Sequence, residues 1–110
     1  MATIYVNDAA TGSNNGSSWT DAYVSLSSVT PTSAGDVIYI ASSHDEHITS
    51  DIVLDAGTAS SPVWLVSATA GSSPVSYAKG ATLRGIQYSV DIEAGTNDYV
   101  VFWGITQIAD

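Results

Sequence analysis

The amino-acid sequence predicts an all-β domain in which short strands stack on one another as the layers of a solenoid. The main observation is a turn-plus-strand unit that occurs three times, with turns starting at residues 34, 56 and 94. The turns lead into the apolar runs 37–41, 63–66 and 100–103. A repeat of this size, with one strand in each copy, is typical of stacked architectures.

The composition points to the same fold class. Charged residues make up only 12% of the chain, and uncharged polar turns alternate with runs rich in Val, Ile, Tyr and Trp. At 110 residues the chain is the size of one domain. An antiparallel β-sandwich or jelly roll is the alternative, because short strands joined by polar turns also fit that fold.

The N-terminal region, residues 1–33, is expected to hold a strand, a loop and a capping helix. Residues 3–6 (TIYV) form the strand and residues 7–18 the polar loop. The helix is predicted over residues 18–29, with a serine as its N-cap and an acidic residue in its first turn. Its apolar stripe has helical spacing and consists of Trp19, Ala22, Tyr23 and Leu26. Such a helix would cover the exposed first layer of the stack.

Residues 34–110 are expected to form the coils. A strand over 36–41 is followed by a polar turn over 42–47 and a second strand over 48–54. The next copy of the repeat gives a strand over 63–67, and residues 68–79 form an inserted loop of small and polar residues.

Three more strands are predicted over residues 81–84, 88–93 and 99–105. The last of them, YVVFWGI, is the most apolar stretch of the chain, and no capping helix is predicted after it. An apolar strand at the edge of a sheet is prone to pair with another chain. This strand is therefore expected to need a neighbour.

The charge excludes several classes of partner. Eleven acidic residues face two basic ones, so the formal net charge is −9. Nucleic acids and anionic membranes are not expected as partners, since both require clusters of Lys and Arg. The chain has no cysteine, no recognisable secretory signal and no apolar run long enough to span a bilayer, so a soluble protein is expected.

The candidate chemical groups do not form a recognisable catalytic set. Residues 44–47 (HDEH) contain metal-ligand types, but we interpret this stretch as a solvated turn. Carboxylates in or near strands could pair across layers for glycoside hydrolysis or calcium binding, with Asp55 opposite Glu93, yet acidic residues at coil corners more often face water. We therefore assign no catalytic, cofactor-binding or metal-binding residue.

Several segments carry a resemblance to a known family. The segments TIYVND, TGSNNGSSWTDAYVSL and AGDVIYIA resemble the N-terminal cap and first coil of right-handed parallel β-helix (pectate-lyase-like) proteins, especially those of phage tail spikes and virions. GTASSPVWLVSA, GATLRGI and NDYVVFWGIT resemble the coils that follow. The resemblance implies a short β-helix of about three coils. No active site of the family maps onto this chain.

The resemblance, the acidity and the missing catalytic sets together predict a non-enzymatic structural protein of a phage particle. It would be a capsid decoration (cement) protein or a tail or fibre module, located in the virion and self-associating as a homotrimer. Exposed aromatic and apolar residues of the strands would contact sister subunits or the capsid. The interface candidates are Tyr99, Val101, Trp103, Ile105, Trp64 and Tyr88. The alternative is a carbohydrate-binding or polysaccharide-degrading β-helix domain.

Overall fold

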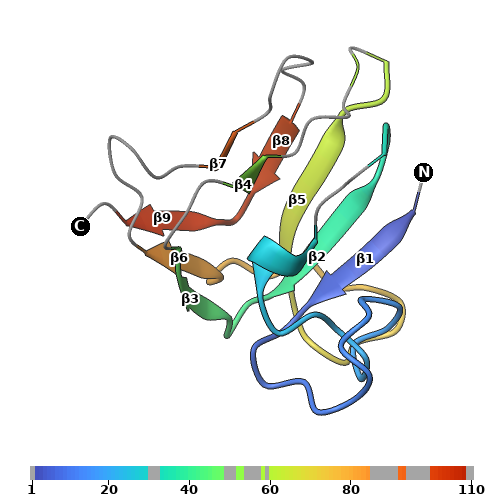
Figure 1. Ribbon diagram of the computed structural model, residues 1–110, viewed down its shortest axis with the longest axis vertical. Coiled ribbons are helices and arrows are strands. Elements are labelled where there is room, and N and C mark those ends of the chain that lie inside the picture. Colours follow the sequence, from blue (N-terminus) through green and yellow to red (C-terminus); the bar gives the residue numbers. More distant parts are fainter. Residues whose placement is uncertain are drawn as a thin grey trace.

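The computed structural model describes residues 2–29, 33–48, 52–53, 58, 60–84, 92–93 and 100–108. This part of the chain is mostly strand, which confirms the all-β class (Figure 1). It contains no helix long and apolar enough to cross a membrane. The strands are β1 (Thr3–Val6), β2 (Val37–Ala41), β3 (Asp45–His47), β4 (Ile52–Val53), β5 (Val63–Ala68), β6 (Thr82–Arg84), β7 (Ile92–Glu93), β8 (Val100–Trp103) and β9 (Thr106–Ile108).

The strands form three parallel sheets. Sheet A has the order β1-β2-β5-β8, sheet B the order β3-β6-β9, and sheet C pairs β4 with β7. The chain visits the sheets in a constant order, because β2, β3 and β4 are followed by β5, β6 and β7, and then by β8 and β9 (Figure 1). Each pass therefore adds one strand to each sheet that it visits, so strands far apart in sequence become neighbours.

The predicted repeat corresponds to neighbouring strands of sheet A. β5 pairs with β8 in parallel, with Val63 opposite Val100 and Val66 opposite Trp103, which is the alignment that the repeat suggests. β2 pairs with β5 in the same direction. Because every pair of named strands is parallel, the antiparallel sandwich is wrong for the described residues.

The hydrophobic core lies on the inner side of the sheets. Alternate residues of a strand face opposite sides, so each strand contributes every second side chain. The fully buried aliphatic side chains of sheets A and B include Val6, Ile38, Ile40, Val63, Leu65 and Leu83. Leu26, Val29 and Ile48 fill the same core from connecting segments.

The predicted helix over residues 18–29 is absent, and that prediction was wrong. The only helical element among the described residues is the 3-10 turn Leu26–Ser28. The rest of the segment is an irregular loop whose residue Tyr23 forms a parallel bridge to Val6 of β1. The residues of the predicted apolar stripe nevertheless face the protein interior, since Ala22 and Leu26 are fully buried and Tyr23 packs against the core.

The helix fails because the backbone groups that it would use are bonded to other segments. The Thr20 carbonyl accepts from the Gly12 N–H (3.0 Å), and the Asp21 carbonyl accepts from the Gly16 N–H (2.8 Å). The Tyr23 N–H donates to the Tyr5 carbonyl (3.0 Å), and the Val24 N–H donates to the Asn14 side chain (3.0 Å). Helical spacing of apolar residues was therefore a misleading signal in a serine-rich segment.

Two further boundaries differ from the sequence predictions. Residues 42–47, expected to be a turn, contain a turn followed by the strand β3. The strand predicted over 99–105 stops at Trp103, because Gly104 adopts φ +69° and turns the chain into β9. Of the strand predicted over 88–93, only residues 92–93 lie among the described residues.

Candidate functional site

The outward side of sheet A is the candidate functional site. Parallel register places side chains of neighbouring strands in rows that run across the sheet. One row contains Val37, Trp64 and Val101, and the next contains Tyr5, Tyr39, Val66 and Trp103. We call this surface the aromatic face, and define it by these residues together with Tyr77 and Trp19.

The rings on the aromatic face form a continuous line across the sheet. Trp19 contacts Tyr5 with ring centroids 5.0 Å apart, and Tyr5 contacts Tyr39 at 5.8 Å. Tyr77 continues the line, at 6.4 Å from Tyr39 and 5.2 Å from Trp103. Tilted rings at such separations attract one another, so the line is a pre-ordered surface.

Three side chains of the aromatic face are partly exposed to solvent, so the face is not part of the buried core. Trp64 is 40% exposed, Trp103 37% and Tyr77 57%. A cavity of about 140 Å³ lies beside Trp64 and Tyr77, and its other lining residues are Val37, Tyr39 and Val66. Burial raises the pKa of Tyr39, and the nearby tyrosines Tyr77 and Tyr5 raise it further. The Tyr39 hydroxyl therefore stays protonated, and the face carries no phenolate charge there.

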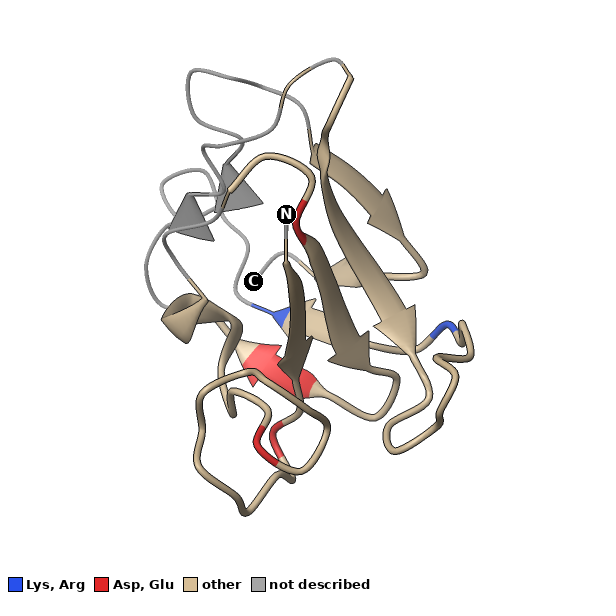
Figure 2. Ribbon diagram, turned by 90° about the vertical axis from the view of Figure 1, so that its right-hand side faces the viewer, with Lys and Arg blue, Asp and Glu red and all other residues tan. Residues whose placement is uncertain are grey.

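The four strands of sheet A contain no Asp, Glu, Lys, Arg or His (Figure 2). In the described part of the chain the Asp, Glu, Lys and Arg residues belong to the loops and to sheets B and C. The aromatic face is thus an uncharged surface on a protein with a formal net charge of −9.

The structure brings together three of the six predicted interface residues. Trp64, Val101 and Trp103 lie on the aromatic face. Ile105 lies beyond the turn at Gly104, where it is partly buried and packs against the hydrophobic core. The remaining two, Tyr99 and Tyr88, lie outside the described residues.

The prediction missed the tyrosines of the aromatic face. Tyr5 and Tyr39 occupy outward positions of predicted strands, so strand alternation carried the signal for them. Tyr77 belongs to the loop between β5 and β6, and its position over the sheet has no counterpart in any sequence periodicity.

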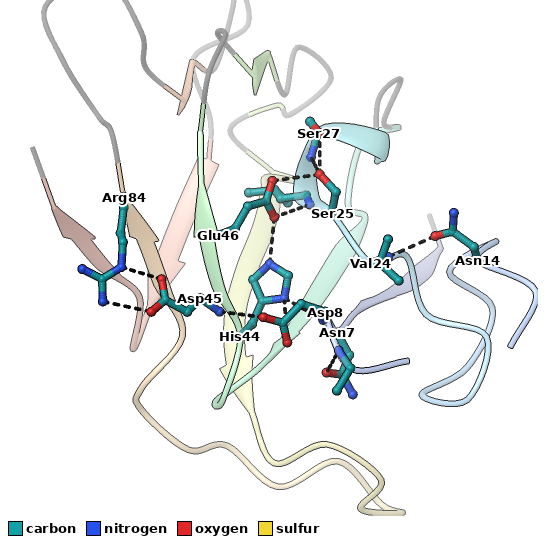
Figure 3. Close-up of polar contacts among 12 residues, drawn as sticks. Asn7, Asp8, Asn14, Val24, Ser25, Ser27, His44, Asp45, Glu46 and Arg84 are labelled. Carbon is teal, nitrogen blue, oxygen red and sulfur yellow. Dashed lines mark hydrogen bonds and ion pairs between the residues drawn. The ribbon is translucent and has the colours of Figure 1, made fainter. Parts of the chain in front are cut away.

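A second polar cluster ties the N-terminal loop to sheet B (Figure 3). His44, predicted to lie in a solvated turn, is in fact buried, which corrects that interpretation. Its Nδ1 accepts a hydrogen bond from the Asp8 N–H (3.0 Å), so the ring proton lies on Nε2. Nε2 donates it to a carboxylate oxygen of Glu46 at 2.7 Å.

Glu46 connects three segments at once. Its carboxylate also accepts hydrogen bonds from the Leu26 N–H (2.7 Å) and the Ser25 hydroxyl (2.8 Å). Burial alone would raise the pKa of Glu46, but the hydrogen bonds from His44, Leu26 and Ser25 outweigh burial and lower it. The cluster is closed to substrate because its atoms already satisfy one another, so it holds the loop rather than carrying out chemistry.

The four residues 44–47 do not form a metal site. Strand alternation separates them, because Asp45 points outward and forms a bidentate ion pair with Arg84 (2.6 and 2.9 Å). The Arg84 hydrogen bond lowers the pKa of the exposed Asp45 carboxyl. No group of three or more metal-ligand side chains occurs among the residues that the structure describes.

The pairing of Asp55 with Glu93 that the sequence suggests stays a prediction. Glu93 lies opposite Val53 in sheet C, and Asp55 lies outside the described residues.

Two open cavities lie between the N-terminal loop and the loop 69–81. Their volumes are about 480 and 300 Å³, and they share Trp19, Thr20 and Gly71. The lining is rich in hydroxyl groups and contains no charged side chain; its other members are Tyr5, Asn7, Ala9, Ala10, Thr11, Ser17, Ser18, Ala70, Ser72, Ser73, Pro74 and Val75.

Comparisons of the chain with protein-family models, with curated proteins and with solved structures give no match.

Proposed function

We propose that this chain is a non-enzymatic structural protein of a phage particle, either a capsid decoration (cement) protein or a tail or fibre module. The observation that supports binding to other subunits is the uncharged aromatic face on a strongly acidic chain. The phage particle is suggested by the resemblance of the N-terminal cap and the coil segments to phage β-helix proteins. The virion would then be the place where the protein acts.

The fold that we propose is a short right-handed parallel β-helix, with sheets A, B and C as its three sides. The constant order in which the chain visits these sheets supports it. The right hand follows from the general preference of parallel crossover connections. In this fold the loop over residues 7–29 takes the capping task that the sequence assigns to a helix, because it hydrogen-bonds the edge of β1.

The binding mechanism is burial of large, rigid side chains against a neighbour. Trp64 and Trp103 are suitable anchors, since tryptophan dominates interface energetics when it is buried in a complex. Val101 lies beside Trp64 in its row, so the anchors form one surface rather than isolated contacts. We expect the chain to self-associate as a homotrimer and to bind a capsid or tail protein through this surface.

Light scattering across a concentration series tests the proposal. The wild-type protein should form an oligomer, and replacing Trp64 by Ser should weaken association by roughly 30-fold, which corresponds to about 2 kcal/mol for an interface hot spot. Val24→Ser is the matched control, because Val24 is 41% exposed but lies on the N-terminal loop. A protein that stays monomeric and binds no capsid or tail subunit would contradict the proposal.

Carbohydrate binding is the second candidate, and the two hydroxyl-lined cavities favour it. Hydroxyl groups match the hydrogen bonds of a neutral sugar, and the ring of Trp19 offers an apolar surface for stacking. Titration with neutral oligosaccharides, followed by tryptophan fluorescence, would separate the candidates. Binding that is lost in Trp19→Ala but kept in Trp64→Ser would favour this candidate.

A further inference from the structure

The two edge strands of sheet A, β1 and β8, differ in whether another segment hydrogen-bonds their outer backbone groups. At β1, the Tyr5 N–H donates to the Gly16 carbonyl (3.0 Å) and the Tyr23 N–H donates to the Tyr5 carbonyl (3.0 Å). The Asn7 N–H donates to the Tyr23 carbonyl (2.8 Å). The N-terminal loop therefore satisfies both outer backbone groups of Tyr5, in the middle of β1, and a further strand could pair along this edge only by displacing the loop.

The opposite edge is β8, the last strand of sheet A in the described part of the chain. Its residue Phe102 lies in register with Leu65 and, one strand further, with Ile38. Both of these side chains are fully buried in the core, whereas Phe102 is 36% exposed. Among the described residues no strand pairs with the outer side of β8, and a partly exposed, inward-facing ring at such an edge is the arrangement that invites another strand.

Charge favours a second copy of the chain as that strand. β8 and its neighbours β5 and β9 contain no ionisable acid or base. Elsewhere the chain repels its own copies, because its formal net charge is −9.

Topology fixes the symmetry of that contact. Head-to-tail stacking would require β8 of one copy to pair with β1 of the next, and the N-terminal loop blocks β1. Within sheet A the edge that remains is β8, and a contact between two β8 edges uses the same surface on both copies. An interface of this kind is two-fold symmetric and closes after two copies.

We propose that β8 pairs antiparallel with β8 of a second copy, so that sheet A continues across the two chains. The Phe102 rings of the two copies then lie on the same inner side of the joined sheet and cover each other. The inference rests on the proposed function, namely that the chain works by self-association. The chain would then have two contacts with its own copies. The aromatic face would form the trimer, and the β8 edge would join two trimers.

Cysteine cross-linking tests this pairing directly, because the natural chain contains no cysteine. Four single variants place a cysteine along the edge strand: Val100→Cys, Val101→Cys, Phe102→Cys and Trp103→Cys. At a two-fold axis a residue meets its own copy, so at least one variant should form a disulfide-linked dimer under mild oxidation. Thr3→Cys on β1 is the control and should stay uncross-linked.

A double variant separates two-fold pairing from head-to-tail stacking. Thr3→Cys combined with the best cross-linking position should stop at linked dimers. A ladder of larger linked species would overturn the proposal. Circular dichroism of each reduced variant confirms that the fold is retained.

The outcomes also separate this inference from the proposed function. If the protein associates, Trp64→Ser dissociates it, and no β8 cysteine cross-links, then only the edge pairing is wrong. A mass corresponding to three copies and no more would also overturn the pairing. If the protein is monomeric at every concentration and binds no capsid or tail subunit, the proposed function fails as well.

Discussion

The two ends of sheet A show how similar strands can have different roles. β1 and β8 are both short, apolar and uncharged, yet the loop over residues 7–29 seals β1 while β8 has no covering segment among the described residues. The difference does not come from the strands themselves. It comes from the loop, whose conformation is held by short polar side chains. Protection of a sheet edge in this protein therefore depends on a connecting segment.

Substitutions at Leu65 and Phe102, which lie opposite each other in β5 and β8, should give the largest difference in the free energy of unfolding. Leu65→Ala should lower the free energy of unfolding by about 3 kcal/mol, because it leaves a cavity in a fully buried site. Phe102→Ala removes a larger side chain from the partner position, yet should lower it by only about 1 kcal/mol in dilute protein. Urea denaturation measures both. Equal losses would mean that β8 is already covered.

The tie between the N-terminal loop and sheet B should be nearly as sensitive. Glu46→Ala should lower the free energy of unfolding by about 3 kcal/mol, since it leaves His44 and the Leu26 N–H without their acceptor. Glu46→Gln keeps the shape and serves as the control, with a smaller loss. Hydrogen exchange of the β1 amides would show whether the loss opens the sealed edge. Unchanged exchange at β1 in Glu46→Ala would separate the cluster from edge protection.

Low pH should weaken the attachment of the N-terminal loop to sheet B, because it protonates Glu46. The folded state lowers the pKa of Glu46, so its contribution to stability is present at neutral pH and is lost as the pH falls below the usual glutamate pKa of about 4.5. The stability difference between wild type and Glu46→Gln should therefore stay constant above about pH 5.5 and shrink as the pH falls from about 4.5 towards pH 3. Thermal denaturation of both proteins over this range measures it. A constant difference would contradict the assignment.

The smallest effect is expected within the loop. Asn14 has φ +57° and its side chain accepts the Val24 N–H, so Asn14→Ala should cost about 1 kcal/mol through strain and a lost hydrogen bond. Asn14→Gly removes the hydrogen bond but not the preferred backbone region, so it should cost less. Thermal unfolding of the two variants compares them. If they are equally destabilised, backbone strain has no part in the effect.

The sequence revealed the sheets better than the segments between them. The repeat aligned Val63 with Val100 correctly, because side-chain alternation and turn chemistry are local properties. Trp64, Val101 and Trp103 could be placed on one side of a sheet for the same reason, and their part in an interface stays a prediction. The place of Tyr77 over the sheet and the Glu46 cluster were missed because they depend on how loops fold back over the sheets. The helix was expected over residues 18–29 from apolar spacing, a serine N-cap and an acidic first turn, but hydrogen bonds to β1 and to the preceding loop overrode it.

One glycine controls whether the first strand stays sealed. Gly16 adopts φ +76°, and a methyl group added to it would lie 2.5 Å from the ring of Tyr23. Both Gly16 and Tyr23 hold the outer side of β1, so Gly16→Ala would displace the segment that blocks it. The chain would then present a free strand at each end, and copies could add without limit. The Gly16→Ala variant, which adds one methyl group, should therefore form fibres of increasing length instead of an oligomer of fixed size. Electron microscopy would show these fibres.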